Sequence, residues 1–262
     1  MGYQIQRLSF GGVFDQAFRL MKENFLLLSA GFAALYVPMN LVQSLLSTED
    51  PTALSGTRLA FSGILVLLAV AFGPLFQLAA TIVIADAYLS RPTTFGVALS
   101  RAFSIFFPYL GTTLLFGLAL IPLTLLFIVP GLYFAVAWML IGPIGVVEGL
   151  FGTRAMKRSR DLVRGHWWRT FGTMTIGTIG STIASMGFAM LFAFIPIVSA
   201  IFSGAVQAVF ATYGTALLIV LYLDLRCRRE DYDLQLLAKD VAGDHSGKPP
   251  AQMGQGPQAT AP

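Results

Sequence analysis

The stretch that decides the fold is residues 109–150, YLGTTLLFGLALIPLTLLFIVPGLYFAVAWMLIGPIGVVEGL, which contains one charged side chain, Glu148, near its end. About 20 residues of helix, rising roughly 1.5 Å per residue, cross the hydrocarbon core of a bilayer. The stretch is therefore long enough to cross twice. Pro130-Gly131 lies near its middle with almost no loop around it. We therefore predict two antiparallel membrane helices joined by a tight turn.

The composition of the whole chain points to the same class of protein. Hydrophobic residues make up 56% and charged residues 11%, against about 25% charged residues in soluble domains. So few polar side chains do not cover a soluble surface, which makes lipid the expected solvent. Cys227 is the only cysteine, so a disulfide framework is excluded. The first two dozen residues lack a signal-peptide pattern, and we expect an uncleaved span to direct insertion.

Working outward from residues 109–150, six apolar segments approach the length of a membrane span. We predict an all-α integral membrane protein with six transmembrane helices, at Phe25–Leu46, Leu59–Leu89, Tyr109–Val129, Gly131–Leu150, Phe171–Ile195 and Phe202–Leu225. The membrane domain occupies residues 1–240 in this prediction. Residues 241–262 are rich in Gly, Pro, Gln and Ala and are predicted to form a disordered cytoplasmic tail.

The basic residues set the expected orientation of the six spans. If the N-terminus is cytoplasmic, 16 of the 17 Lys and Arg residues lie on the cytoplasmic side, and Arg58 alone lies on the other. The positive-inside rule then places both termini in the cytoplasm. An odd number of spans destroys this asymmetry. We therefore predict a multi-pass protein of a bacterial inner membrane.

Amphipathic segments precede the odd-numbered spans. The first has its apolar residues on one helical face, at Phe10, Val13, Phe14, Ala17, Phe18 and Met21. A similar pattern runs from Phe95 to Phe106, and a looser one from Phe151-Gly152 to Val163. We expect three interfacial helices on the cytoplasmic face. Each is followed by two spans, so the chain is predicted to contain a threefold repeat of a helix plus a hairpin.

The third amphipathic segment is the richest in basic residues. Residues 154–168 are RAMKRSRDLVRGHWW, and one helical arc contains Arg154, Lys157, Arg158, Arg160 and Arg164, together with Asp161. Arginine binds phosphate through paired hydrogen bonds, which suggests a site for anionic lipid headgroups. The alternative is a topology signal that holds the loop inside, and we favour it because every polytopic protein needs one. Trp167 and Trp168 fit interfacial anchors.

Three acidic residues close the even-numbered spans: Asp86, Glu148 and Asp224. Ion pairing with a nearby arginine, such as Arg226 for Asp224 or Arg91 for Asp86, is the favoured interpretation. His166 is the one histidine outside the tail, so no metal cluster and no metal or other cofactor is expected. No span carries a charge near its middle, where ion-coupled transporters commonly place one.

A family resemblance rests on two sets of residues. The first comprises Pro130-Gly131-Leu132-Tyr133, Trp138, Pro143, Glu148-Gly149 and the run from Ser159-Arg160 to Trp168-Arg169; the second comprises Tyr222 to Arg226, Arg228-Arg229-Glu230 and Asp233-Leu234. Together they resemble stand-alone bacterial members of the glycerophosphoryl diester phosphodiesterase membrane-domain family. That resemblance implies a membrane module related to phospholipid metabolism. The catalytic barrel joined to some members is not expected here, so the hydrolytic activity does not carry over.

The function predicted from the sequence is a non-enzymatic, lipid-interacting or scaffolding module of the membrane. Its expected partners are anionic phospholipids and a second membrane protein or copy of itself, and no nucleic acid. The alternative is a small transporter or lipid-translocating protein without ion coupling. An enzyme ranks third, because it would have to work with Glu148, Asp86 and His166 at the cytoplasmic face.

Overall fold

The structure is a computed structural model that describes residues 7–47, 56–88, 93–191 and 195–231. The described residues form helices and no strand, which confirms the predicted all-α class. Three helical stretches in these ranges are long and apolar enough to cross a membrane: Gly96–Leu126, Ile128–Glu148 and Ile197–Glu230. The chain is therefore an all-helical membrane protein. The predicted tail, residues 241–262, lies outside the described residues.

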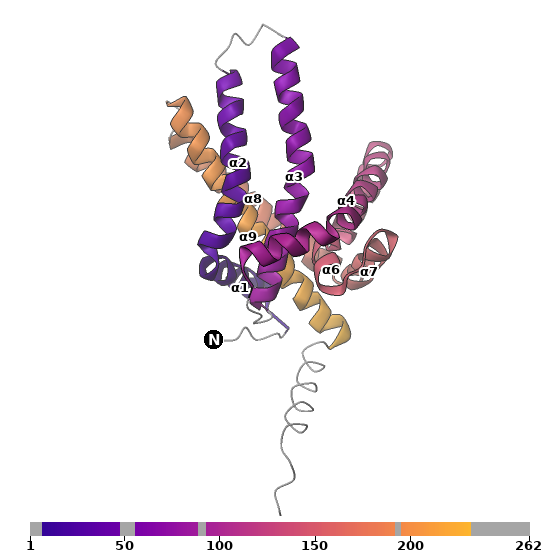
Figure 1. The fold of residues 1–262 in the computed structure, drawn as a ribbon. Helices are drawn as coiled ribbons and strands as arrows, with labels where there is room; N and C mark the ends of the chain where they lie inside the picture. The colour runs from indigo at the N-terminus through magenta and orange to yellow at the C-terminus, as the bar shows by residue number, and fades with distance from the viewer. Residues whose placement is uncertain (1–6, 48–55, 89–92, 192–194, 232–262) are drawn as a thin grey trace, which may run out of the picture.

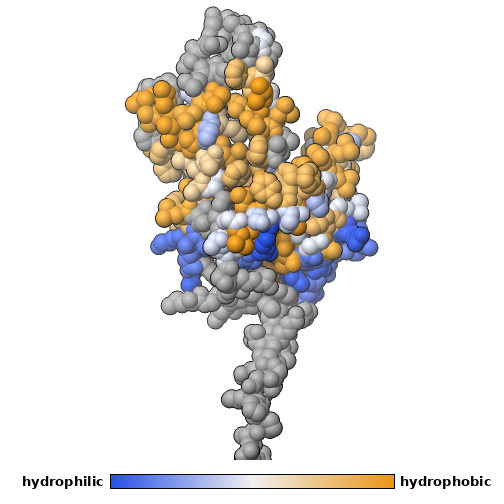
Figure 2. All heavy atoms as spheres, in the orientation of Figure 1, coloured by the Kyte–Doolittle hydropathy of each residue, from blue (hydrophilic) through white to orange (hydrophobic). Residues whose placement is uncertain are grey.

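The helices follow one another with short connections. Their bounds are α1 (Phe10–Glu23), α2 (Phe25–Ser47), α3 (Gly56–Tyr88), α4 (Phe95–Leu126), α5 (Ile128–Ala137), α6 (Ile141–Glu148), α7 (Thr153–Val163), α8 (Trp167–Leu191) and α9 (Pro196–Glu230). In Figure 1, α2 and α3 rise side by side from a base that contains α1 and α7, and the later part of α4 rises apart from them. Hydrophilic residues form a band at this base, with apolar surface above it (Figure 2).

The buried core lies at the base, around the second half of α9. Leu217, Ile219, Leu221, Tyr222 and Leu225 of α9 have almost no exposed surface. The upper parts of the helices instead present large apolar side chains outward, and Leu125 of α4, for example, is 81% exposed. Transfer of each such side chain out of water is favourable by about 1.5–3 kcal/mol. The upper half of the structure therefore requires a lipid environment.

The first and third amphipathic segments form separate helices, α1 and α7, as predicted. Ser9 caps α1 by accepting a hydrogen bond from the Gly12 amide at 3.0 Å, and the axes of α1 and α2 meet at 83°. All three amphipathic segments bury residues spaced i and i+4: Val13 and Ala17, Ala98 and Ala102, and Ala155 and Ser159. Residues with this spacing lie on one face of a helix, and that face packs against the core at the base.

The second amphipathic segment differs from the prediction. Residues 95–106 are helical but continue without a break into the following apolar helix, so α4 has 32 residues instead of beginning at Tyr109. Such a helix is about 48 Å long, more than a bilayer core. Pro108 lacks the backbone donor that would bond to Ser104, which permits a bend without ending the helix. In Figure 1, α4 runs across the base before it rises.

The fourth predicted span is broken into α5 and α6. The break at residues 138–140 leaves backbone groups without helical partners, and Ser159 of α7 satisfies two of them. Its hydroxyl donates to the Ala137 carbonyl at 2.7 Å and accepts from the Leu140 amide at 3.2 Å. Ser159 is fully buried there. A polar residue on the apolar face of α7 therefore supplies hydrogen bonds that the interrupted helix lacks.

Candidate functional site

Helix α7 presents an apolar face to the core and a basic face outward. Glycines with positive φ shape both of its ends: Gly152, with φ 65°, precedes the helix, and Gly165, with φ 85°, follows it. Ala155, Met156, Leu162 and Val163 are buried beneath the helix. Arg154, Lys157 and Arg160 are therefore exposed at the base of the molecule, whereas Arg158 is partly buried.

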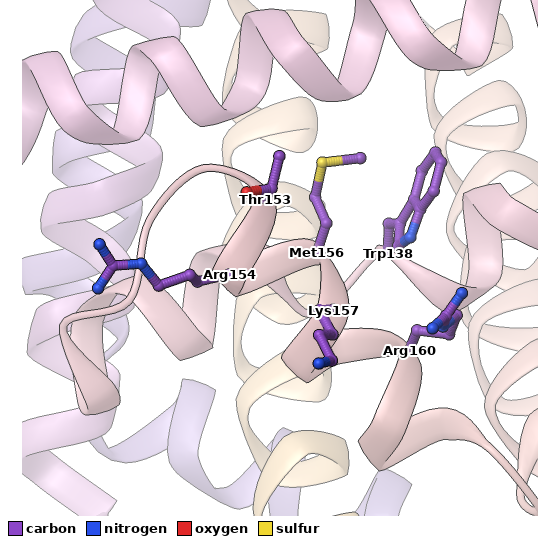
Figure 3. Close-up of a pocket in the computed structure, with 6 residues that line it drawn as sticks. All are labelled: Trp138, Thr153, Arg154, Met156, Lys157 and Arg160. Atoms are coloured by element: carbon purple, nitrogen blue, oxygen red, sulfur yellow. The ribbon is translucent and has the colours of Figure 1, made fainter.

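An open pocket of about 420 Å³ lies between α7 and the C-terminal end of α5. It is lined by Trp138, Thr153, Arg154, Met156, Lys157 and Arg160. Figure 3 shows the Trp138 ring near Arg160 at one side, Arg154 at the other, and Met156 between them. The pocket thus combines cationic walls with an indole ring and a thioether.

The cations of the pocket have no recorded counter-charge. Across the described ranges, no ion pair joins Arg154, Lys157 or Arg160 to a carboxylate. Two unit charges 4 Å apart interact by about 1 kcal/mol in water and by about four times as much near a protein surface. Three like charges around one pocket therefore repel, and a bound anion relieves that repulsion.

Arg158 belongs to the predicted basic arc but makes different contacts. Its Nε and Nη2 atoms donate to the two carboxylate oxygens of Glu148, at 2.7 and 3.0 Å, and its guanidinium also pairs with Glu230. The Tyr222 hydroxyl donates to Glu148 at 2.7 Å. The two glutamates raise the pKa of Arg158 above its ordinary value. Arg158 thus ties α7 to α6 and α9 and is occupied by carboxylates, unlike the pocket cations.

The remaining predicted site residues, Arg164, Trp167 and Trp168, lie outside the pocket lining. Arg164 follows α7 and is exposed, but it does not line the pocket. The Trp167 indole nitrogen donates to the Tyr133 carbonyl at 3.2 Å, and its ring stacks between those of Tyr133 and Phe171, with centroids 5.9 and 5.1 Å away. Trp168 is 78% exposed, as expected of an interfacial anchor.

A chain of aromatic contacts links the pocket to α8. Centroids of neighbouring rings are 4.7–6.4 Å apart, in the order Phe116, Trp138, Phe134, Tyr133, Trp167 and Phe171. Such separations are typical of favourable ring contacts. The chain fixes Trp138 at the edge of the pocket and joins α4, α5 and α8 at the level of the base.

The acidic residues at the ends of the even-numbered spans are ion-paired, as expected, but the partner expected for Asp224 differs from the ones observed. Asp86 pairs with Arg101 of α4 at 2.6 Å, and Arg91 lies outside the described residues. Asp224 pairs with Arg169 and Arg228, each at 3.0 Å, and accepts from the Leu8 amide at 2.8 Å. The expected Asp224–Arg226 pair is wrong, because Arg226 faces Glu230 at 3.1 Å.

His166 lies in the turn between α7 and α8. Burial, together with Arg228 and Arg229, lowers its pKa below the ordinary value of 6.5, despite the opposing effect of Asp224. Its Nδ1 atom is buried without a hydrogen-bond partner among the described atoms. No group of three or more His, Cys, Asp or Glu residues gathers in the part of the chain that the structure describes, so a metal site finds no support there.

Sequence reasoning missed three residues of the pocket: Trp138, Thr153 and Met156. Trp138 lies at the helix break that Ser159 repairs, and nothing in its local sequence places it beside Arg160. The arc of cations could be derived from helical spacing, and the spacing also included Arg158. Only the long-range contacts with Glu148 and Glu230 separate Arg158 from the other cations.

Comparison with known proteins gives one family and no relative. The family model of a domain of unknown function, DUF8558, matches residues 20–225. No curated protein and no solved structure matches the chain. The matched range contains α2 to α8, most of α9 and the whole pocket.

Proposed function

Because the chain belongs to the DUF8558 family, described only as a domain of unknown function, we propose its role from its own residues. We propose a non-enzymatic, polytopic membrane module that binds the phosphate of an anionic phospholipid in the α7 pocket. The observation that carries the proposal is a group of cations, Arg154, Lys157 and Arg160, which make no ion pair within the described ranges and surround a pocket bordered by Trp138. Cations of this kind, held beside an indole ring at the membrane surface, favour lipid phosphates.

The proposed setting is a bacterial inner membrane crossed six times, with both termini in the cytoplasm. The split of basic residues supports it, since Arg58 alone falls on the opposite side. The threefold repeat is also proposed, with support from the acidic residues. Each contacts the amphipathic segment that follows it, through the Asp86–Arg101 and Glu148–Arg158 pairs. Asp224 completes the cycle by binding the amide of Leu8, just before α1.

Reporter fusions test the six-span topology. A reporter at Ser47, the end of α2, is expected to lie outside the cytoplasm, and a reporter at Gly243 is expected to lie inside. The physical reason is the charge asymmetry, because translocating 16 basic residues costs far more than translocating one. Paired alkaline phosphatase and green fluorescent protein fusions at each position give opposite signals for the two sides. The same side for both positions contradicts the topology.

The resemblance to glycerophosphoryl diester phosphodiesterase membrane domains agrees with a phospholipid ligand. Transport without ion coupling is the alternative function. Polar side chains within the helices bond to one another, as in the part-buried Gln77–Thr215 pair at 3.0 Å and the more exposed Asn40–Gln207 pair at 3.3 Å. Such pairs join neighbouring helices, so they favour a scaffold over a polar pathway.

Lysine substitutions test the pocket while keeping its charge. In the double variant Arg154→Lys with Arg160→Lys, co-purified anionic phospholipid at high salt is expected to fall about threefold to tenfold. Lysine keeps the positive charge that sets topology but loses the planar fork that binds phosphate with two bonds. Native mass spectrometry of the full chain, extracted with its lipids and washed at rising salt, measures the retained lipid.

Arg229→Lys is the matched control for the double variant. Arg229 is an exposed arginine outside the pocket and donates to the Asp161 carbonyl at 2.8 Å. Its substitution is expected to leave the retained lipid unchanged. If the double variant keeps as much anionic lipid as the control, the basic face is a topology signal only. Unchanged reporter signals in the double variant exclude a loss through misinsertion.

A further inference from the structure

We propose that the α7 pocket selects a phosphomonoester, which carries nearly two negative charges, over a phosphodiester, which carries one. The inference rests on the proposed function and names the headgroup chemistry of the same site. Two sources supply this chemistry: a lipid that ends in a bare phosphate, and a water-soluble phosphate ester. The argument follows from the charges of the pocket and its neighbours.

The positive charge of the pocket is not cancelled by the network beside it. Glu148 and Glu230 are balanced by Arg158 and Arg226, which pair with them. That network is therefore neutral, and the charges of Arg154, Lys157 and Arg160 remain in excess. Asp161, one turn beyond Lys157, makes no ion pair with it among the described contacts, and the exposed Arg164 adds a further cation nearby.

A phosphomonoester matches this excess better than a phosphodiester. Its second ionisation has a pKa of about 6, so it carries roughly −1.5 to −2 at pH 7 and presents three acceptor oxygens. A diester carries −1 and presents two free oxygens, which leaves about two of the three cations without a counter-charge. The additional charge interacts with every cation of the pocket, and we expect a preference of about tenfold.

The start of α7 adds to the attraction of the pocket for a phosphate group. The pocket includes Thr153 and Arg154 of the first turn of α7, where no side chain caps the free backbone amides. Free amides at a helix start add to the attraction for an anion that the cations already provide. Trp138 and Met156 offer apolar contact for the adjoining glycerol and acyl groups.

A competition between two lipids with identical acyl chains tests the preference. The full chain is incubated with an equimolar mixture of phosphatidic acid, a monoester, and phosphatidylglycerol, a diester, and native mass spectrometry counts the bound species. At pH 7.5 we expect about tenfold more phosphatidic acid. At pH 5.5 the monoester is mostly singly charged, so the ratio is expected to approach one. A ratio of one at both pH values overturns the inference.

The variant Lys157→Gln removes one charge from an exposed position of the pocket. It is expected to lower the monoester-to-diester ratio at pH 7.5 severalfold, whereas Arg229→Gln, outside the pocket, is expected to leave it unchanged. Equal falls in both variants overturn the inference, since they indicate general surface attraction. The two proposals can fail separately. If the protein retains both lipids in equal amounts, and this retention depends on Arg154 and Arg160, the preference for a monoester is wrong and the proposed function stands. Absence of any retained anionic lipid overturns both.

Glycerol 3-phosphate, added as a soluble competitor, identifies the source of the phosphomonoester. If it displaces phosphatidic acid at a similar concentration, the pocket binds a water-soluble ester, and the acyl chains contribute nothing. If displacement needs a large excess, the pocket binds a lipid. Either result supports a phosphomonoester when the competitor glycerophosphoglycerol, a soluble diester, is about tenfold weaker. Equal potency of the two soluble competitors overturns the preference.

Discussion

The substitution Asp224→Asn is expected to lower the free energy of unfolding by about 3 kcal/mol or more. The Asp224 carboxylate is fully buried and binds Arg169, Arg228 and the Leu8 amide. Removing its charge leaves two guanidiniums in the base without an anion, and breaking a buried pair in this way typically costs about 3–5 kcal/mol. Asparagine has nearly the same volume, so the loss reports the charge and not a cavity.

Thermal unfolding of the purified protein in one fixed detergent measures this loss. The apparent Tm is expected to fall by about 6 °C or more, from roughly 2–4 °C per kcal/mol for a chain of this size. Glu23→Gln is the matched control, because it removes one carboxylate from the Arg19–Glu23 pair, in which both side chains are about half exposed. Exposed pairs contribute about 0–1 kcal/mol. Equal shifts in the two variants contradict a special role for Asp224.

The consequence reaches beyond local stability, because the Asp224 contacts join the two ends of the fold. Arg169 lies in the first turn of α8 and Arg228 in the last turn of α9. Both guanidiniums also donate to the Leu8 carbonyl, just before α1. The segment before α1 is thereby attached to the last hairpin. Loss of Asp224 is therefore expected to expose the region around Leu8 to proteases before the rest of the chain unfolds.

The class of the fold could be predicted from sequence patterns, because the physical reasons for it are local. A chain with long uncharged segments has no soluble alternative, and helices are the way to satisfy the backbone in lipid. The amphipathic spacing of α1 and α7 is also local, and both exist as separate helices. Trp168 at the start of α8 is 78% exposed, which suits the predicted interfacial anchor, a role that needs no tertiary partner.

The partners of the charged residues could not be derived from the sequence, because they are distant along the chain. Arg226 is two residues from Asp224, but such neighbours point to different sides of a helix, and the Asp224 partners are Arg169 and Arg228. The same limit explains Arg158, whose charge belongs to the predicted arc but whose partners come from α6 and α9. Helical spacing gives the direction of a side chain and not the element that it meets.

The predicted helix boundaries were wrong at two places. One is Pro108, where the helix continues, and the other is residues 138–140, where it breaks. Pro108 is compatible with a bent α4 because the helix continues on both sides of it, so no break appears at residues 106–109. The opposite occurs at residues 138–140, where the helix breaks just ahead of Pro143, which has no amide to bond to the Met139 carbonyl. There the buried hydroxyl of Ser159 replaces the missing backbone bonds, and this contact spans about 20 residues of sequence.

The substitution Gly204→Ala is expected to lower the free energy of unfolding by about 2–3 kcal/mol, although alanine is the better helix former. Gly204 lies where α9 crosses α2. A Cβ atom there would be 2.7 Å from the Val37 Cα atom, 2.9 Å from the Val37 nitrogen and 3.0 Å from the Tyr36 carbonyl oxygen. These are backbone atoms, which cannot rotate away, so the two helices must separate.

Gly214→Ala is the control, because it places the same substitution in the same helix with an open environment. No heavy atom lies within 4 Å of a Cβ atom built at Gly214, so the helix preference of alanine is expected to stabilise the protein by up to about 1 kcal/mol. The two variants should therefore shift the apparent Tm in opposite directions. Separation of α2 from α9 also stretches the Asn40–Gln207 hydrogen bond, already 3.3 Å long. If Gly204→Ala raises the Tm as Gly214→Ala does, α2 and α9 do not cross at Gly204 in the folded protein.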